Sequence, residues 1–292
     1  MTLVQLKHFV TLATAGSFVR ASGLLFITQP ALSRSIKSLE DELGQLLFDR
    51  VGKRIELTPF GSDILRRSQS LLDDASQMKN TGKVLKPDDD GRLRLGLGSG
   101  PGHLLTVPLM THFARTFPRF HIDIVRANTA ALTQMLRDRQ VDALVVDLRS
   151  LVPAPDLKVT QVAELDGAFM CRQNHALTKK RKLKIQDVLN YPLASTPLSD
   201  ELARILVARY GELAHPLAMV KLSSDEISHL IQVVENSDAV LLAVRACGPQ
   251  LVELQLDPPL RAQARLGMVT LSQRVEPLVL PEIRRLMEKI LV

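Results

Sequence analysis

The sequence contains only two cysteines, Cys171 and Cys247, and no apolar run that approaches the length of a membrane span. Two cysteines give no disulfide framework, so we expect each to be a small buried hydrophobic residue, with a redox-sensing thiol as the alternative. The N-terminal segment is amphipathic and lacks the pattern of a signal peptide. We therefore expect a cytoplasmic protein without structural disulfides.

Three common enzyme signatures are also missing. None of the seven histidines forms a pair at the i, i+4 spacing of a zinc-binding helix, and no serine lies in a glycine–x–serine–x–glycine elbow. Gly96 and Gly98 begin like a dinucleotide-binding turn, but Pro101 stands where the third glycine belongs. We expect no enzymatic activity, no metal and no cofactor.

The composition is that of a globular protein with more than one domain. The chain has 292 residues, of which 46% are hydrophobic and 23% are charged. Its formal net charge of +6 permits nucleic-acid binding. Residues 1–58 hold seven Lys/Arg against five Asp/Glu, a difference of +2, so the basic residues near the N-terminus are clustered rather than abundant.

The stretch from Ser17 to Leu43 predicts two helices joined by a tight turn. Ser17 can cap the first helix, and the run Thr28-Gln29-Pro30 can open the second. The first helix is expected to make apolar contacts through Val19, Ala21, Leu24 and Leu25. The second has apolar residues at spacings of four, three and four, which predicts one buried face: Leu32, Ile36, Leu39 and Leu43.

The other face of the second helix carries hydroxyl, amide and arginine groups near its N-terminus, which is typical of a helix-turn-helix that reads a DNA major groove. A helical hairpin inside an ordinary domain, with Arg34 and Lys37 as solvated residues, is the alternative. The next segment, from Leu47 to Pro59, predicts a two-stranded wing with a glycine turn and a basic tip.

These residues resemble the N-terminal domain of LysR-type transcriptional regulators over about sixty positions. Two departures, Gly23 in the first helix of the motif and Phe60 before Gly61, concern local packing. The resemblance rests on the runs Thr28-Gln29-Pro30-Ala31-Leu32-Ser33-Arg34, Leu39-Glu40, Leu43-Gly44, Leu47-Phe48, Arg50, Leu57-Thr58-Pro59 and Gly61.

The resemblance implies a regulator that binds double-stranded DNA at inverted-repeat sites as a homodimer, with homotetramers and RNA polymerase as further partners. The base-reading residues would lie on the second helix of the motif, and the phosphate or minor-groove contacts would come from that helix and the wing. The residues concerned are Gln29, Pro30, Ser33, Arg34, Lys37, Arg50, Lys53 and Arg54.

A long helix is predicted from residue 59 to about residue 79. Its seam consists of Ile64, Leu71 and Met78 at a period of seven, with Ala75 between them. This seam favours pairing with the same helix of a second copy, and an amphipathic helix lying on its own domain is the alternative. A breaker-rich hinge follows at residues 86–91 and marks the clearest domain boundary.

The rest of the chain alternates strands and helices, which predicts an α/β half with parallel, doubly wound sheets. The fold class is therefore multi-domain α/β: a winged helix-turn-helix (1–58), a linker helix and hinge (59–90), and an effector-binding domain (91–292). The resemblance implies two lobes similar to periplasmic binding proteins, with lobe I at about 91–160 and 266–292 and lobe II at about 161–265. Separate strands are expected at 159–162 and 167–171, and a closing helix at 281–291 should pack on lobe I.

Ligands of open α/β sheets bind beyond the carboxyl ends of strands, where helix N-termini present free amides. If the resemblance holds, an effector lies between the lobes, and the residues that contact it are Ser99, Gly100, Asn128, Thr129 and Thr196. Helix caps and turns are the alternative role for these side chains. Asp147 could favour an amine or could pair with Arg149.

A second function class stays open. A solute-binding or sensory module without transcriptional output would explain the C-terminal two-thirds equally well. It would not explain the run from Thr28 to Arg34 or the basic wing.

Overall fold

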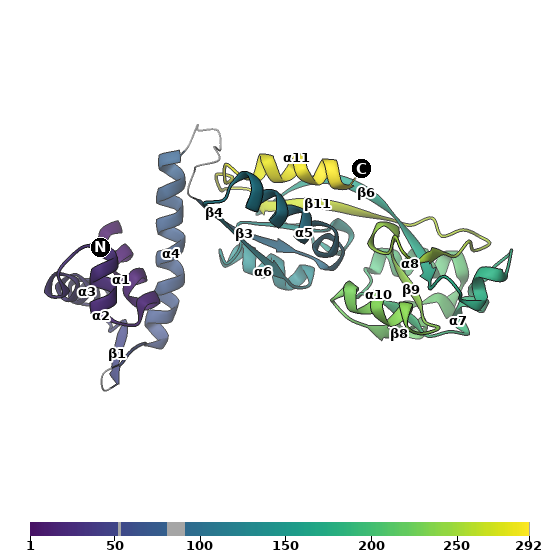
Figure 1. The fold of residues 1–292 in the computed structure, drawn as a ribbon, viewed down its shortest axis with the longest axis horizontal. Helices are drawn as coiled ribbons and strands as arrows, with labels where there is room; N and C mark the ends of the chain where they lie inside the picture. Colours follow the sequence, from purple (N-terminus) through teal and green to yellow (C-terminus); the bar gives the residue numbers. More distant parts are fainter. Residues whose placement is uncertain (52–53, 81–90, 292) are drawn as a thin grey trace. The chain divides into compact units, whose positions relative to one another are not determined.

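The computed structural model describes residues 1–51, 54–80 and 91–291 (Figure 1). The chain separates into two compact units that divide between residues 84 and 85. Each unit has its own hydrophobic core, and each is described by itself below.

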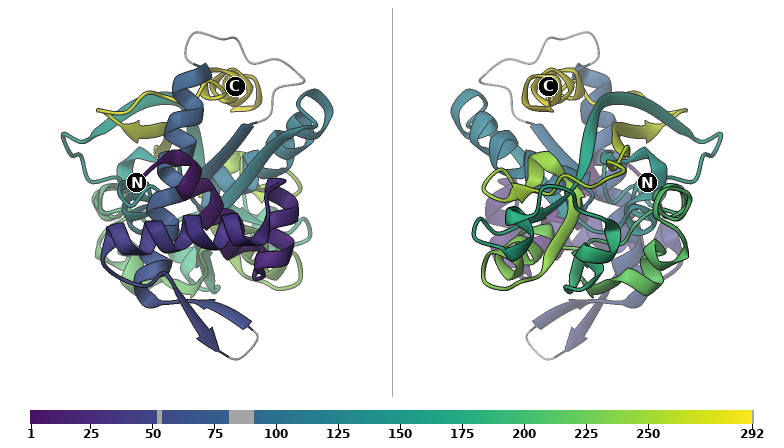
Figure 2. Two further views of the ribbon diagram at one scale, coloured as in Figure 1. Left: turned by 90° about the vertical axis from the view of Figure 1, so that its left-hand side faces the viewer. Right: turned by 90° about the vertical axis from the view of Figure 1, so that its right-hand side faces the viewer.

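The N-terminal unit is a three-helix core followed by a hairpin and a long helix. The hairpin strands are antiparallel, and the hairpin projects away from the helices as a wing (Figure 2, left). The elements are α1 (Leu3–Ala15), α2 (Phe18–Leu25), α3 (Gln29–Leu43), β1 (Phe48–Val51), β2 (Arg54–Leu57) and α4 (Pro59–Asn80). The fully buried centre of this unit includes the large side chains of Phe9, Leu12, Leu32, Leu39 and Leu47.

The start of α3 confirms the sequence prediction, whereas α2 corrects two others. Thr28 is the N-cap of α3, and its Oγ1 accepts a hydrogen bond from the Ala31 amide at 3.4 Å. Ser17 holds the N-cap position of α2, but its side chain makes no capping hydrogen bond, so that prediction is wrong. Val19 and Leu24 are also not core residues, because 67% and 64% of their surfaces are exposed.

Helix geometry explains the error in α2. At about 100° per residue, an eight-residue helix can turn only one stripe toward the core. Ala21 is fully buried and Leu25 half-buried, so Val19 and Leu24 fall outside that stripe. On α3 the same geometry buries Leu32, Ile36 and Leu39 with Leu43 half-buried, as predicted.

The described residues of the predicted seam on α4 lie in different environments. Ile64 packs against the core of its own unit together with Leu65 and Leu72, as the alternative interpretation of this helix expected. Leu71 is exposed, and Ala75 is half-buried. The side chain of Met78 and the hinge at residues 86–90 lie outside the described residues.

The C-terminal unit consists of two α/β lobes that share two long antiparallel strands (Figure 1). In lobe I, β3 (Gly91–Leu97) pairs in parallel with β4 (Phe120–Arg126) and β5 (Ala143–Asp147). In lobe II, β7 (Leu193–Ser195) pairs in parallel with β8 (Val220–Ser223) and β9 (Val240–Val244). The shared strands are β6 (Leu157–Cys171) and β11 (Gln263–Leu271), and β10 (Val252–Glu253) pairs with β6.

Helices cover both lobes. Lobe I carries α5 (Ser99–Thr116), α6 (Thr129–Arg137) and α11 (Leu280–Leu291), and lobe II carries α7 (Ile185–Leu189), α8 (Asp200–Tyr210), α9 (Pro216–Met219) and α10 (Ile227–Glu235). Short 3-10 turns lie at Leu148–Ser150, Ala176–Lys179, Glu212–Ala214 and Arg245–Cys247. The apolar face of α11 packs into the core of lobe I, as predicted for the closing helix. Helix α5 begins at Ser99.

Strand β6 is continuous where the sequence predicts two strands. It pairs with β11 as far as Asp166 and then with β9 from Gly167 onward. Ala163 and Leu165, in the segment between the two expected strands, pack against the core of lobe I. The chain therefore enters lobe II at Gly167 rather than near residue 160. It returns along β11, whose first residue is Gln263.

Candidate functional site

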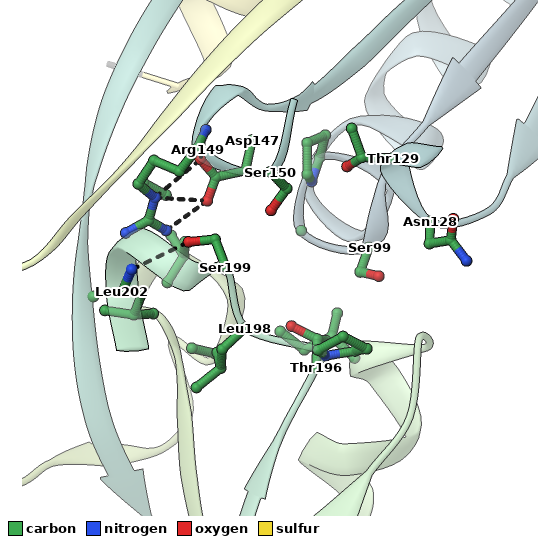
Figure 3. A pocket seen from close by; sticks show the side chains of 18 of the residues that line it. Ser99, Asn128, Thr129, Asp147, Arg149, Ser150, Thr196, Leu198, Ser199 and Leu202 are labelled. Atoms are coloured by element: carbon green, nitrogen blue, oxygen red, sulfur yellow. Dashed lines mark hydrogen bonds and ion pairs between the residues drawn. The ribbon is translucent and has the colours of Figure 1, made fainter. Parts of the chain in front are cut away.

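A cavity of about 630 Å³ lies in the C-terminal unit, beyond the carboxyl ends of the parallel strands of both lobes. This is the place where α/β sheets bind ligands. Ser99, Gly100, Asn128, Thr129 and Thr196 all line it, and Figure 3 shows Ser99 and Thr129 on one wall with Thr196 facing them. The structure thus brings the five predicted residues together, and their role in binding stays a prediction.

Lobe I contributes two helix N-termini to the cavity. Helix α5 follows β3, and α6 follows β4, so both helices start at the same edge of the sheet. The first amides of a helix have no acceptor within it, and the lining residues Ser99, Gly100, Thr129 and Ala130 carry such amides. Asn128 is the N-cap of α6, and its Oδ1 accepts from the Ala131 amide at 2.9 Å. The side-chain oxygen of Asn128 therefore has the helix-capping role, which was the alternative to contact with an effector.

Lobe II presents Thr196 just after β7. The preceding Ser195 is fully buried and donates its hydroxyl to the Leu242 carbonyl at 2.8 Å, which makes it a structural residue. Ser199 caps α8, because its Oγ accepts from the Leu202 amide at 3.3 Å. Thr196 presents a hydroxyl on this wall of the cavity. No hydrogen bond of that hydroxyl is found among the described residues.

Asp147 pairs with Arg149, which was one of the two alternatives for this carboxylate. The Arg149 Nε lies 3.0 Å from both carboxylate oxygens, and Nη2 also donates to Oδ2. Only 7% of the Arg149 side chain is exposed. Arg149 is the one Lys, Arg or His among the described lining residues, and Asp147 neutralises it.

An ion pair that the sequence did not indicate joins the two lobes beside the cavity. The Arg126 guanidinium donates to the Glu226 carboxylate at 2.9 Å and to the Ser99 carbonyl at 3.0 Å. Burial raises the pKa of Glu226, but the hydrogen bond from Ser228 and the charge of Arg126 outweigh it, so the pKa lies below its usual value. A Cβ on Gly102 would come within 2.5 Å of Arg126 Nε, so this glycine makes room for the guanidinium.

A second ion pair between the lobes joins the shared strand β11 to helix α8. Arg265 of β11 donates to Glu201 at 2.6 Å, and both side chains are exposed by more than a third. The partners of the two interlobe pairs are 100 and 64 residues apart in the sequence. No local pattern marks such partners, which is why the sequence could not reveal them.

The two cysteines have buried thiols. Burial raises the pKa of Cys171 to about 11 and that of Cys247 to about 12. Cys247 also lines the cavity. A thiol with so high a pKa holds little of the reactive thiolate at neutral pH, so the structure favours the buried hydrophobic role for both.

Four of the predicted DNA-binding residues share one face of α3. Pro30, Ser33, Arg34 and Lys37 follow the i, i+3, i+4, i+7 spacing of a single helical face. Pro30, Arg34 and Lys37 are exposed, as is Gln29, and Ser33 is half-buried. Among the described residues, no ion pair occupies Arg34 or Lys37.

The wing residues are only partly described. Arg50 lies on β1 and Arg54 on β2, but their side chains lie outside the described residues. Lys53 also lies outside the described residues. Within the described part of the chain, no group of three or more His, Cys, Asp or Glu is placed to hold a metal ion, and no helix is long and apolar enough to cross a membrane.

Comparison with family models decides what the two units are. The model "Bacterial regulatory helix-turn-helix protein, lysR family" matches residues 3–62, and "LysR substrate binding domain" matches residues 87–290. The chain belongs to the LysR family. The helix pair is therefore the reading motif of a DNA-binding domain and not a hairpin inside an ordinary domain, and this LysR-type protein is a DNA-binding transcriptional regulator with a substrate-binding domain.

Relatives and solved structures agree with this assignment. The regulator is 33% identical over 281 residues to the "SDS degradation transcriptional activation protein" of a Pseudomonas species, which covers 93% of this chain and 90% of the relative. An OxyR mutant from Corynebacterium glutamicum has a TM-score of 0.68 at 22% identity, covering 99% of this chain and 92% of that one. A probable transcriptional regulator from Pseudomonas aeruginosa gives 0.69 at 16% identity, covering 99% and 97%. These two structures support the fold alone.

Proposed function

We propose that this LysR-type regulator binds its effector in the interlobe cavity, through Ser99, Gly100, Asn128, Thr129 and Thr196. The observation that carries the proposal is the cavity itself, which gathers these residues from both lobes. The hydroxyls of Ser99, Thr129 and Thr196 and the first amides of α5 and α6 would hold a polar group of the ligand. Asn128 would contribute its amide nitrogen, because its oxygen caps α6.

The regulatory step is a population shift between lobe arrangements. A ligand that touches both lobes binds the closed arrangement more tightly than an open one, and this differential affinity moves the equilibrium. In a homodimer that pairs through α4, or in a tetramer assembled from such dimers, this change would alter the spacing of two DNA-reading domains. The exposed Leu71 on α4 supports a second copy at that face.

The DNA target is an inverted repeat read by two copies of α3. Gln29, Pro30, Ser33 and Arg34 would meet base edges and nearby phosphates, and Lys37 would add phosphate contacts. Arg50, Lys53 and Arg54 of the wing would contact phosphates or the minor groove, which makes binding depend on salt. RNA polymerase is the partner through which bound regulator would change transcription.

The proposed action of the chain is binding, of an effector and of DNA, which the name of a relative as a transcriptional activation protein supports. One relative's name concerns the degradation of SDS, an alkyl sulfate, so alkyl compounds are the first effectors to test. Ser99→Ala and Thr129→Ala should weaken the response to a true effector without changing DNA affinity. Thr111→Ala, an exposed position on α5, is the matched control. An unchanged response in both site variants would refute the proposed site.

DNA reading is tested by selecting genomic fragments with the purified full-length protein and sequencing them. The expected result is a sharp set of inverted repeats. Arg34→Ala should weaken binding to such a site by about 5- to 150-fold, equivalent to about 1–3 kcal/mol, and relax the choice of base at one position. Arg20→Ala removes the same charge from an exposed position on α2 and should have little effect. Equal losses on all sequences would assign Arg34 to phosphate instead.

A further inference from the structure

We infer that the interlobe cavity takes an amphiphile with an uncharged polar group and a long apolar body, an inference that rests on the proposed effector site. Of the 28 described residues that line the cavity, 16 are Ala, Val, Leu, Ile, Pro or Cys. Such walls gain affinity from apolar surface that leaves water. A small polar metabolite would leave most of them without a partner.

The cavity offers an anionic group no unpaired cation among the described residues. The described lining holds one guanidinium, Arg149, and three carboxylates, Asp147, Asp200 and Asp225, so its formal side-chain charge is −2 before the helix N-termini are considered. Asp147 already neutralises Arg149. An anion moved into this site would lose its hydration without meeting a free cation, and that loss is costly.

The nearby arginines of the two lobes do not change this balance. Arg126 is paired with Glu226, and Arg265 is paired with Glu201. Each interlobe pair is neutral as a whole. An anion that recruited either guanidinium would have to break a contact that holds the lobes together.

A cationic group is also a poor fit. Asp200 lies in the first turn of α8, and Asp225 lies just before α10, so the positive ends of these helices offset the two carboxylates. The opposite wall presents the free amides of Ser99 and Thr129, which repel a cation. Those amides and the neighbouring hydroxyls suit an uncharged oxygen, such as that of an alcohol.

Hydroxyls and leucines lie on different sides of the cavity, which gives the ligand an orientation. Ser99, Thr129 and Thr196 lie on one side, and Leu198 and Leu202 lie toward the other, where Ser199 and the neutral pair of Asp147 and Arg149 also lie (Figure 3). The polar group would lie between the hydroxyls, with the alkyl chain running along the leucines. Because the two sides use residues of both lobes, an occupied cavity favours the closed arrangement.

The test is calorimetric titration of the full-length protein with hexan-1-ol, octan-1-ol and decan-1-ol, and with decyl sulfate and decylamine below their micellar concentrations. One alcohol should bind per chain. Affinity should rise about fourfold per added methylene until the cavity is filled. Decan-1-ol should bind at least tenfold more tightly than either charged decyl compound. Tighter binding of the sulfate or the amine, or no dependence on chain length, would overturn the inference.

Two variants separate the cavity from adsorption of alkyl chains to exposed surface. Ala243→Phe fills part of the cavity and should weaken decan-1-ol binding at least tenfold. Leu217→Phe changes an apolar residue of the same lobe that is 90% exposed and does not line the cavity, so binding should not change. If Ala243→Phe does not fold, Thr196→Val keeps the side-chain shape, removes the hydroxyl and should weaken binding about fivefold. Equal affinity of wild type and the folded cavity variant would overturn the inference.

Failure of this inference differs from failure of the proposed function. If no alcohol binds but selected DNA still yields inverted repeats, the ligand class is wrong and the DNA-binding regulator stands. If decan-1-ol binds at the cavity but no DNA sequence is selected, the ligand class stands and the proposed DNA target is wrong.

Discussion

The guanidinium of Arg126, at the end of β4 in lobe I, lies 2.9 Å from the carboxylate of Glu226, at the start of α10 in lobe II. The two residues are 100 positions apart, so the contact exists only while the lobes are close together. It lies beside the cavity, because Ser99, Asp225 and Ile227 are both its neighbours and lining residues. The pair therefore reports on the lobe arrangement that an effector would select.

Glu226→Gln should destabilise the C-terminal unit, and the loss should depend on pH. The lowered pKa of Glu226 means that its stabilising contribution is present above the usual pKa of a glutamate and is lost as pH falls through the lower folded value. Because the pair is part-exposed, the effect at pH 7 should be about 1 kcal/mol or less. Melting curves from pH 7 down to below about pH 4 should converge for variant and wild type. Glu235→Gln, at the exposed end of α10, is the control. A difference in melting temperature between Glu226→Gln and wild type that stays constant from pH 7 to below about pH 4 would contradict the role of this ion pair.

Gly61→Ala and Gly23→Ala should change stability in opposite directions. A Cβ on Gly61 would lie 2.0 Å from the Leu47 carbonyl oxygen, so the wing and α4 would have to separate. We expect a loss of about 2–3 kcal/mol. A Cβ on Gly23 meets nothing within 4 Å, so alanine should stabilise α2 by about 0.5–1 kcal/mol. Urea unfolding measures both, and a stabilised Gly61→Ala protein would contradict the described packing.

Phe26→Asn should stabilise the DNA-binding domain. Phe26 has a φ of 54° at the C-terminal cap of α2, a left-handed conformation that asparagine tolerates better than a bulky side chain. Its ring is 96% exposed and loses little packing when replaced. The expected gain is about 1 kcal/mol. Leu24→Asn, an exposed helical position on the same element, should bring no gain, and an equal gain there would attribute the effect to polarity instead.

Both thiols should react slowly at neutral pH. Burial raises the pKa of Cys171 to about 11 and of Cys247 to about 12, so the thiolate fraction grows only in strongly alkaline solution. Labelling with a thiol reagent at pH 7 should be at least tenfold slower in the folded protein than in urea. Peroxide treatment should leave DNA binding unchanged. Fast labelling of either cysteine in the native protein would restore the redox-sensing alternative.

Several features of this regulator follow from local sequence. The spacing of Leu32, Ile36 and Leu39 determines the buried face of α3, and therefore also the opposite face that carries Arg34. Thr28 marks the start of that helix because capping involves atoms only three residues apart. The cavity residues could be predicted for a similar reason. Ser99, Asn128 and Thr196 each follow a strand closely, and parallel strands end at one edge of a sheet.

Other features depend on contacts between distant segments, which only the tertiary structure decides. The exposure of Val19 and Leu24 depends on where the core lies around α2, and apolar character alone does not indicate it. The continuity of β6 depends on its pairing with β11, about 100 residues later. The sequence left Asp147 with two alternatives, an amine ligand or Arg149, and indicated no partner for Arg126. The charge of a cavity depends on which ion pairs form in three dimensions, and local sequence does not show this.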